Sequence, residues 1–580
     1  MAEPTAKRIL WWEDGKASIE AEEGWFAEAG LEFRLDQRLF LDHAVVVFRG
    51  ELRLGDKRTS ASVHYPPAYG VGGHPVVVAP NLHLGRHQDP TGAMCLDHPA
   101  LGETRPMYGA EAVVLAERLW FLWENDRDQL AQEEADAPDP RANYYEYERD
   151  SAVALIDVDV SDFDAGYIRF GAHQYKPFRA GVSEVRTSDP AESTLPSASG
   201  IAAFIGPHEV NGRWVRVSEA PPASHKELEP WVKEHCLSTV EEVIHFAEAT
   251  RQLQGRGDLP AVIGFVYPDE GPGRGEIHDA WLFLVIHPNR RGQMARAFHM
   301  RSDERWLRQP QLHPLQTKSV AIVGVGALGS PIADLLAKAG VGNLLLNDPD
   351  IYTPGNRVRH QLDLADLGLP KVQAMASRVG RVNPWSSVEG SELRLGGAIH
   401  GLGEEMQQEL HDNMLRDLSS YDLLVNTTAQ TIAGYYCSRL ACEIEKPILH
   451  AWVSAGAWGG RILLQRPGYS GCTECLALFQ KSATAHGDVE IPSVEHDPNV
   501  KEIQERGCAD TTFTGPGFEL TATAAAAARV AVQSLLDGNG YPAADFDLVT
   551  LNFRDGDTAM STATYSRLPV HPECSICNRE

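Results

Sequence analysis

Positive charge is scarce in this sequence. Its 580 residues include 52 lysines and arginines against 80 aspartates and glutamates, which gives a formal net charge of −28. Because so large an acidic excess repels phosphate groups, we expect a protein that binds neither nucleic acid nor an anionic membrane surface. Long apolar runs are also missing, since none approaches the roughly 18 residues of a membrane span. The first residues, MAEPTAKRILWWEDGK, lack the apolar core of a signal peptide.

Cysteine is sparse as well. There are nine in the chain, an odd number, which argues against a secreted scaffold held by disulfides. We therefore expect a cytoplasmic protein whose cysteines bind metal or react. Hydrophobic residues make up 43% and charged residues 23%, the balance of a folded globular protein. The length allows two to four domains.

We predict three domains, over residues 1–140, 141–310 and 311–580, divided at charged or proline-tipped stretches. The first has the order helix, three-stranded meander, structured loop, helix, which is an α+β unit. Its helices and strands are predicted over 19–28, 44–53, 59–65, 75–79 and 110–124. The middle domain mixes predicted strands with a helix over 239–254. It carries no motif, so we expect an α+β fold without chemistry of its own.

The third domain opens with a glycine-rich turn between a strand and a helix. Gly324, Gly326 and Gly329 form a G-x-G-x-x-G pattern, and strand 343–347 follows the helix. This βαβ order is typical of a Rossmann-like parallel sheet, in which the glycines allow a tight turn, close phosphate approach and close packing. Asp348 ends the second strand, where a carboxylate can hold ribose hydroxyls. The sequence therefore predicts an adenine nucleotide site.

Cationic residues beyond the second strand favour a triphosphate. Asp348-Pro349-Asp350 is followed by Asn356, Arg359, then Gly368-Leu369-Pro370-Lys371, then Asn383-Pro384. The order D-x-D, N-x-x-R, G-x-P-K, N-P resembles the ThiF-type adenylating domain of ubiquitin-activating enzymes and their bacterial sulfur-carrier relatives. The resemblance covers about residues 318–577. It implies ATP as substrate, Asn356 and Arg359 on the phosphates, Lys371 on the triphosphate, and a homodimer.

Two positions depart from that family. A glutamine is usual where His360 stands, and the family's magnesium-binding aspartate is replaced by Ala429. The magnesium ion that accompanies ATP would then be held by Asp350, by Asn426 or mainly by the nucleotide itself. The departure leaves the fold prediction intact and the metal-binding residue open.

Six of the cysteines can be sorted by spacing. Cys472 with Cys475, and Cys574 with Cys577, form two C-x-x-C pairs, the pattern of a closed structural Cys₄ zinc site. A redox function for each pair would need a thioredoxin-like context. The family resembled carries a zinc site of this kind. Cys437 and Cys442 lie on an apolar predicted helix and are assigned to the core.

Cys508 stands apart from the zinc pairs, in a polar loop before an alanine-rich helix. A cysteine near a helix start is favoured as a thiolate. In the sulfur-carrier relatives a cysteine in this place can accept the activated acyl group, so we predict a thioester at Cys508. The alternative is an inert loop cysteine.

Cys95 is the notable cysteine of the first domain. Gly92 three residues before it, Leu96-Asp97 after it and Tyr65-Pro66-Pro67 upstream resemble the catalytic loop of ubiquitin-conjugating enzymes. That family has His-Pro-Asn where this chain has Gly85-Arg86-His87, so His87 would replace the asparagine that stabilises the oxyanion. The alternative is a buried loop cysteine.

Taken together, these features predict ATP-dependent activation of a protein's C-terminal carboxylate, a thioester at Cys508, transfer to Cys95 and attack by an amine such as lysine. The domain order resembles fused enzymes of bacterial antiphage operons that encode cGAS-like nucleotidyltransferases. That resemblance implies a cGAS-like nucleotidyltransferase, or a ubiquitin-like protein, as acyl donor in antiviral defence. Two alternatives are a sulfur-carrier adenylyltransferase and a nucleotide-binding regulatory protein without chemistry.

Overall fold

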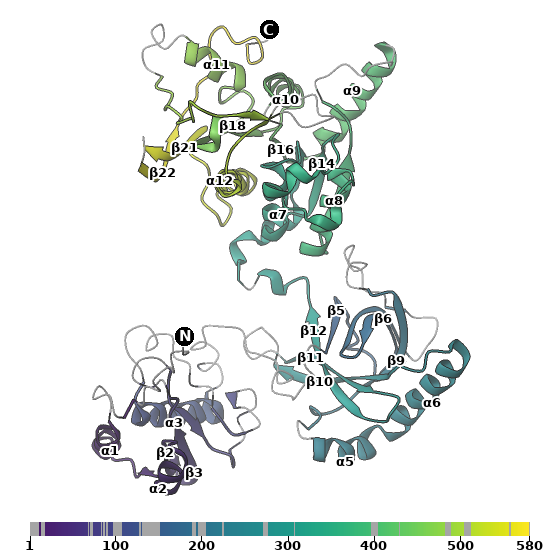
Figure 1. Ribbon diagram of the computed structural model, residues 1–580, viewed down its shortest axis with the longest axis vertical. Coiled ribbons are helices and arrows are strands. Elements are labelled where there is room, and N and C mark those ends of the chain that lie inside the picture. Colours follow the sequence, from purple (N-terminus) through teal and green to yellow (C-terminus); the bar gives the residue numbers. More distant parts are fainter. Residues whose placement is uncertain are drawn as a thin grey trace, which may run out of the picture. The chain divides into compact units, whose positions relative to one another are not determined.

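The structure is a computed structural model, and two compact units divide it near Arg301. It describes residues 11–12, 18–67, 69, 73–82, 84, 87–88, 91–94, 96, 107–126, 129, 151–187, 193–194, 205–222, 225–270, 277–306, 308–395, 404–428, 430–481, 489–503, 512–555 and 558–578. The first unit holds two separate sheets and the second holds one large sheet (Figure 1). No helix of these described ranges has both the length and the apolar character needed to cross a bilayer.

The N-terminal sheet is a four-stranded antiparallel meander in the order β1-β2-β3-β4. Its elements are α1 (Ile19–Glu28), β1 (Arg34–Leu35), α2 (Gln37–His43), β2 (Val47–Leu54), β3 (Lys57–His64), β4 (Val76–Val78) and α3 (Gly109–Asn125). Helix α1 has the predicted bounds, and α3 extends the predicted helix by one residue at each end. Strand β1 and helix α2 were not predicted from the sequence. Two residues cannot show strand alternation, and α2 buries none of its residues.

The middle domain is built on an eight-stranded sheet in the order β5-β12-β11-β10-β9-β6-β7-β8, and β5 also pairs with β7. Its strands are β5 (Ala152–Ile156), β6 (Ala165–Tyr175), β7 (Phe178–Thr187), β8 (Ser193–Thr194), β9 (His208–Arg216), β10 (Ala261–Glu270), β11 (Ile277–Ile286) and β12 (Gly292–Met300). The β5–β7 pairing closes the sheet on itself around an apolar interior that includes Phe170, Trp214 and Phe283. Helices α5 (His225–His235) and α6 (Leu237–Gln254) pack outside β10 and β11 through a second apolar cluster.

The second unit has an eight-stranded sheet in the order β15-β14-β13-β16-β17-β18-β21-β22, in which the first five strands are parallel. Its strands are β13 (Ser319–Val323), β14 (Asn343–Asn347), β15 (Ser387–Ser391), β16 (Leu423–Asn426), β17 (Ile448–Val453), β18 (Gly459–Gln465), β21 (Leu548–Asp555) and β22 (Thr558–Ser566), with a separate pair β19 (Glu502–Ile503) and β20 (Thr512–Phe513). The predicted βαβ unit is confirmed, and β14 has the predicted bounds.

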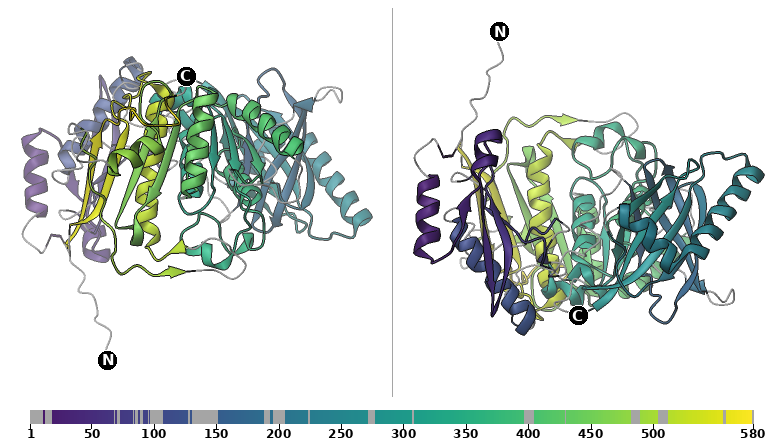
Figure 2. Two further views of the ribbon diagram at one scale, coloured as in Figure 1. Left: turned by 90° about the horizontal axis from the view of Figure 1, so that it is seen from above. Right: turned by 90° about the horizontal axis from the view of Figure 1, so that it is seen from below.

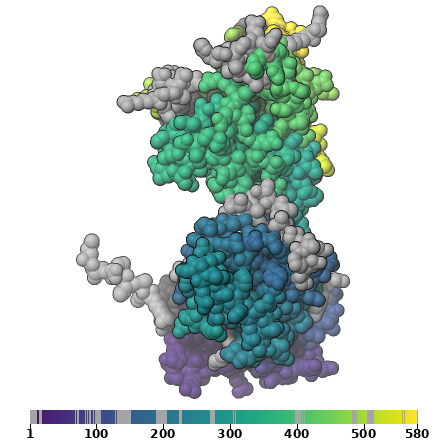
Figure 3. Space-filling view, turned by 90° about the vertical axis from the view of Figure 1, so that its right-hand side faces the viewer, coloured from purple at the N-terminus to yellow at the C-terminus, as the bar shows by residue number. Residues whose placement is uncertain are grey.

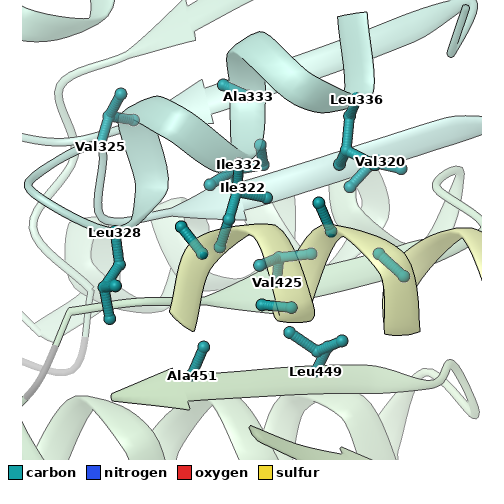
Figure 4. Packing of buried hydrophobic residues seen from close by; sticks show 14 of the residues in the cluster. Val320, Ile322, Val325, Leu328, Ile332, Ala333, Leu336, Val425, Leu449 and Ala451 are labelled. Carbon is teal, nitrogen blue, oxygen red and sulfur yellow. The ribbon is translucent and has the colours of Figure 1, made fainter. Parts of the chain in front are cut away.

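Helices cover both faces of this sheet (Figure 2). The described helices of this unit are α7 (Gly329–Ala339), α8 (Lys371–Val382), α9 (Glu404–Ser419), α10 (Thr431–Glu443), α11 (Thr473–Lys481) and α12 (Gly517–Leu536), with the 3₁₀ helices η4 (Glu304–Trp306), η5 (Pro310–Thr317), η6 (Pro354–Val358), η7 (Leu364–Asp366) and η8 (Ala455–Ala457). Figure 4 shows Ile322 of β13 next to Ile332 of α7, in an apolar cluster that also includes residues of α12. Helices α7, α8 and α12 share this apolar face, while α9 and α10 cover the other.

Candidate nucleotide site and cysteine cluster

The glycine turn lies where the strand order of the second sheet reverses. From β13 the chain adds β14 and β15 on one side, then returns to add β16 on the other. The carboxyl ends of β13 and β16, at Val323 and Asn426, are therefore neighbours. Such a switch point is where open α/β sheets bind their ligands, in the crevice beyond the strand ends.

The three glycines of the turn have different surroundings. Gly324 has φ +86°, and a Cβ atom there would lie 2.9 Å from the Thr428 nitrogen. A Cβ on Gly329 would lie 1.9 Å from the Gly324 oxygen, so the helix could not begin so close to the strand. A Cβ on Gly326 would meet no atom within 4 Å. The turn is thus tight at Gly324, closely packed at Gly329 and open at Gly326, which agrees with the three predicted roles.

Asp348 fastens the turn to the end of β14. One carboxylate oxygen accepts a hydrogen bond from the Val325 nitrogen at 2.7 Å, and the other accepts from the Asp350 nitrogen at 3.0 Å. Burial raises the pKa of this carboxyl above its ordinary value, although the Lys371 charge opposes the shift. Each oxygen has a further lone pair, so Asp348 can brace the turn and still accept from a ribose hydroxyl.

Lys371 brings a buried positive charge to the same place. Its ammonium lies 2.9 Å from an Asp350 oxygen and 3.8 Å from an Asp348 oxygen. The side chain of Lys371 is 8% exposed, whereas that of Asp350 is 49% exposed. The structure therefore joins three of the residues from the predicted pattern in one cluster, with the Asp350 carboxylate at its solvent side.

The segment with the other predicted phosphate ligands is the 3₁₀ helix η6. The side-chain oxygen of Asn356 accepts from the nitrogen and hydroxyl of Thr353 at 3.0 and 3.1 Å, which shapes the turn. Arg359 follows η6 and is half-buried. A Cβ on Gly517 would lie 2.5 Å from the Val358 oxygen, so this segment packs directly on the start of α12.

His360 supports the glycine turn. From the sequence it was noted only because the resembled family usually has a glutamine at this position. Its Nδ1 accepts from the Leu362 nitrogen at 3.1 Å, so Nε2 carries the proton and donates to the Val325 oxygen at 2.7 Å. Burial lowers the pKa of this imidazole to about 4. Both backbone polar atoms of Val325 are thus hydrogen-bonded: the nitrogen donates to Asp348, and the oxygen accepts from His360. The histidine that stands in place of the family's usual glutamine therefore donates a hydrogen bond to the turn.

A buried chain of hydrogen bonds runs from the strand end at Asn426 to the cysteine pairs. The Asn426 amide oxygen accepts from the Thr428 nitrogen at 3.2 Å, and its nitrogen donates to His450 Nδ1 at 3.0 Å. His450 Nε2 donates to the Ser438 hydroxyl at 3.1 Å, and that hydroxyl lies 2.9 Å from the Thr473 hydroxyl. Thr473 stands between Cys472 and Cys475, so the chain links the nucleotide turn to the first cysteine pair.

His450 makes the fold sensitive to acid. It is 1% exposed, and burial lowers its pKa to about 4 from an ordinary 6.5. The unfolded chain therefore takes up a proton first, and the stability held above pH 6.5 is lost as the pH falls toward 4, by about 3 kcal/mol. We expect the melting temperature of the wild-type protein to fall more steeply between pH 6.5 and 4.5 than that of His450→Gln. The contribution of His360 is the same in both proteins and cancels in the comparison. Parallel curves of melting temperature against pH would therefore contradict the assignment of the acid sensitivity to His450.

The four predicted zinc ligands lie together. The sulfur atoms of Cys472, Cys475, Cys574 and Cys577 are all within 4.8 Å of one another. The closest pair, Cys472 and Cys574, is 3.4 Å apart, and no disulfide joins them. The Glu474 carboxylate accepts from the Ile576 nitrogen at 3.0 Å and from the Ser575 hydroxyl, so it ties one pair to the other. Three buried thiols and one half-buried thiol at this spacing suit a tetrahedral metal ion.

The remaining cysteines of α10 divide between core and cluster. Cys437 is buried under the sheet, as predicted, and burial raises the pKa of its thiol to about 12. Cys442 is half-buried beside the four-cysteine cluster, where its sulfur accepts from the Gln465 amide at 3.2 Å. Its position next to the cluster was not foreseen from the sequence, because helical spacing does not reveal which neighbour a helix face meets.

In the N-terminal domain, His87 is buried, and the described residues of the loop that follows it lie against strand β4. His87 is 4% exposed, and its ring lies edge-on to Trp123 of α3 at 5.4 Å between centroids. Gln88 pairs with Met94, and the Met94 nitrogen donates to the Val77 oxygen at 2.8 Å, which pins the loop to β4. Glu22, missed from the sequence, accepts from the Tyr65 hydroxyl at 2.6 Å and the Gly109 nitrogen at 3.0 Å, so it joins α1 to the start of α3.

Three predicted positions lie outside the described residues. They are Cys95 and Cys508, the two predicted acyl acceptors, and Ala429, which stands where the resembled family has a magnesium ligand. Their assignments remain predictions from the sequence.

Comparison with known proteins identifies the class of the second unit. Residues 303–562 match the model of the ThiF family. The chain is 28% identical over 537 residues to the uncharacterised protein y4oA of Sinorhizobium fredii, covering 86% of this chain and 87% of that protein. It is 30% identical over 185 residues to the ATP-dependent ubiquitin transferase-like protein Cap2 of Pseudomonas aeruginosa, 30% of each chain. It is 29% identical over 161 residues to ubiquitin-like modifier-activating enzyme 5 of Rattus norvegicus, 28% of this chain and 40% of that one. The chain thus contains a ThiF-family domain. Its matches to Cap2 and to the modifier-activating enzyme span less than half the length of each of those two proteins.

Proposed function

We propose that this protein uses ATP to activate the C-terminal carboxylate of a protein and then passes the acyl group to an amine. The observation that carries the proposal is the switch-point cluster, in which an open glycine turn, the buried carboxylate of Asp348 and the buried ammonium of Lys371 meet. The match to the ThiF family and the similarity to an activating enzyme and to a ubiquitin transferase-like protein support the same chemistry.

In the first step a carboxylate oxygen of the acyl donor attacks the α-phosphorus of ATP. The bond from that phosphorus to the bridging oxygen breaks, pyrophosphate leaves and an acyl-adenylate forms. The open side of Gly326 and the positive end of the α7 dipole suit the phosphates. Lys371 and Arg359 supply positive charge for the leaving pyrophosphate, since charge that develops in the transition state is what such groups stabilise best.

Asp350 is the better of the two magnesium ligands considered from the sequence. Both polar atoms of the Asn426 side chain are engaged, one by Thr428 and the other by His450. The Asp350 side chain is half-exposed beside Lys371, and carboxylate oxygens are the ligands that magnesium prefers. We therefore propose that Asp350 and the phosphates of ATP together hold the ion.

In the later steps the acyl group moves between thiols. The Cys508 thiolate attacks the acyl carbon, the bond to AMP breaks, and the thiol proton passes to solvent. Cys95 then accepts the acyl group by thioester exchange, and an amine attacks it to form an amide and release the Cys95 thiolate. His87 would donate to the oxyanion. We propose a cGAS-like nucleotidyltransferase or a ubiquitin-like protein as acyl donor, and antiviral defence as the setting.

Zinc is the metal that we propose for the four-cysteine cluster, because a closed set of four thiolates suits a structural zinc ion. Elemental analysis should find about one zinc per chain. The double variant Cys475→Ser, Cys577→Ser should be metal-free and less stable by several kcal/mol, since metal binding contributes directly to folding. Cys437→Ala, a buried cysteine of α10 outside the cluster, is the matched control and should keep its zinc. Wild-type protein that is metal-free and as stable as the loaded form would refute the assignment.

Exchange of label between pyrophosphate and ATP tests whether the protein is an enzyme or only a nucleotide binder. With the acyl donor present, sought among the proteins encoded beside this gene, we expect exchange that depends on magnesium and on the donor's C-terminal carboxylate. ATP binding without exchange, under conditions where the donor also binds, would favour a regulatory nucleotide-binding protein instead.

A further inference from the structure

The middle domain, in which no sequence motif indicates a function, contains a pocket of about 620 Å³. The pocket lies on the outer face of the closed sheet, where strands β6, β7 and β9 run beside α6. Helix α6 is at the right of this domain in Figure 1 and faces the viewer in Figure 3, within the blue and teal surface. The residues that line the pocket all belong to the first unit, and those of the nucleotide site belong to the second.

The floor of the pocket consists of two rows of side chains that cross the three strands. Tyr167 of β6 is paired with Arg186 of β7 and with Arg213 of β9, which gives the row Arg186-Tyr167-Arg213. Arg169 is paired in the same way with Glu184 and Asn211. Because side chains two residues apart point to the same face of a strand, both rows face the pocket, while the intervening Ile168 and Trp214 contribute to the apolar interior.

The wall of the pocket is one side of α6. Glu242, Phe246 and Ala249 line it at intervals of four and three residues, and Val243 lies at its base. Two aromatic rings remain half-exposed there, Phe246 at 52% and Tyr167 at 48%. Folded domains seldom leave aromatic rings of a helix and a sheet exposed next to each other. Where they do, the rings commonly mark a binding surface.

Within the described residues, Arg213 and Arg186 have donor nitrogens with no hydrogen-bond acceptor. The guanidinium of Arg213 stacks on the Tyr167 ring at 4.1 Å and lies 3.3 Å from a Glu242 oxygen, yet within the described residues nothing accepts from its buried Nε. Arg186 donates from Nε to Glu184 at 2.6 Å, and that carboxylate also lies 3.0 Å from Arg169. The terminal nitrogens of Arg186 make no hydrogen bond to the described part of the chain. The lining holds three arginines against the carboxylates of Glu184 and Glu242, and the Glu209 carboxylate lies 3.7 Å from Arg169 beside it, so the pocket lacks the acidic excess of the whole chain.

We propose that this pocket binds a small planar anion, an aromatic ring system that carries a carboxylate, sulfonate or phosphate group. The flat faces of Tyr167, Phe246 and the guanidinium groups suit a stacked ring. The spare donors of Arg186 and Arg213 suit the oxygens of the anionic group, because guanidinium groups bind such oxyanions in pairs. The volume is within the range of small-molecule sites.

The probe for this site is 1-anilinonaphthalene-8-sulfonate, and N-phenyl-1-naphthylamine is its match without the sulfonate. Titrated into the full-length protein, the sulfonate should bind saturably and increase in fluorescence. Arg186→Gln and Arg213→Gln should weaken the sulfonate at least tenfold and change the affinity for the neutral amine by less than twofold. Phe246→Ala should weaken both. Displacement of the probe by guanosine monophosphate or by indole-3-acetate would distinguish a nucleotide from an aromatic carboxylate as the ligand.

Arg179→Gln is the matched control, because Arg179 is exposed on the same strand as Arg186 and lies outside the pocket. It should bind both compounds as the wild type does. Arg186 is the safer of the two test positions, since Glu184 keeps its ion pair with Arg169 when Arg186 is changed. Sulfonate binding that is equal in the wild type, Arg186→Gln and Arg213→Gln would overturn the proposal. So would equal weakening of the neutral amine, which would show that the arginines only support the fold.

Discussion

Lys371→Ala should lose two to three orders of magnitude in the rate of ATP–pyrophosphate exchange, about 3–4 kcal/mol of transition-state stabilisation. Lys371 is the buried cation of the nucleotide cluster, and its ammonium separates the carboxylates of Asp348 and Asp350. Without it, the carboxylates of Asp348 and Asp350 lose the ammonium that offsets their negative charge beside the departing pyrophosphate. Arg359→Ala should change the rate in the same direction, because it removes a second positive charge.

Two controls make the Lys371 result specific. Lys338 lies at the opposite end of α7 from the glycine turn, where it pairs with Asp334 at 2.7 Å, so Lys338→Ala should exchange at the wild-type rate. The melting temperature of each variant shows whether the fold is intact. If Lys371→Ala and Arg359→Ala both exchange label at the wild-type rate, the nucleotide site has been placed wrongly.

Cys508→Ala and Cys95→Ala should both abolish conjugation, but at different steps. Neither thiol takes part in adenylate formation, so both variants should retain ATP–pyrophosphate exchange. Cys508→Ala should form no thioester, because Cys95 would have no activated donor within its reach. Cys95→Ala should load Cys508 and stop there, while Cys95→Ser should trap an oxyester that resists thiols, since an alkoxide leaves less readily than a thiolate. Non-reducing gels with the acyl donor, ATP and magnesium report each species.

His87→Ala separates loading from transfer in the same assay. It should leave the loading of Cys95 largely intact and slow the attack by amine, because an oxyanion donor acts when the tetrahedral charge develops. The order of the two thiols is open to direct contradiction. Conjugation by Cys508→Ala at the wild-type rate would mean that Cys95 takes the acyl group straight from the adenylate. A sulfur-carrier adenylyltransferase, the other enzyme considered, would form no thioester at Cys95.

Local sequence patterns predicted the elements that position the nucleotide site. Strand β14 was predicted with its exact bounds because a short apolar run is enclosed by Gly342 and Asp348, and the spacing of Gly324 from Gly329 indicated the turn. The spacing of the C-x-x-C pairs indicated the cysteine cluster, whose four sulfurs the structure brings together across about a hundred residues. The glycine turn consists of residues that are close together in the sequence. The cysteine cluster consists of two pairs, and the members of each pair are close together in the sequence.

What the sequence did not reveal depends on contacts between distant strands and helices. The link from Asn426 through His450 and Ser438 joins β16, β17 and α10, and no spacing along the chain indicates which of these side chains meet. The row of Tyr167 between Arg186 and Arg213 arises from the register of three strands, one of which is not adjacent in sequence. Register is set by the whole sheet, so such sites are visible only once the fold is known.

The most direct test of carboxylate activation follows oxygen from the acyl donor. The donor is prepared with its C-terminal carboxylate labelled with ¹⁸O and is incubated with the protein, ATP and magnesium, and the AMP is analysed by mass spectrometry. If a carboxylate oxygen attacks the α-phosphorus and the acyl carbon is then taken by a thiol, one labelled oxygen must remain on each AMP. Unlabelled AMP, or label found in ADP or inorganic phosphate, would contradict the account.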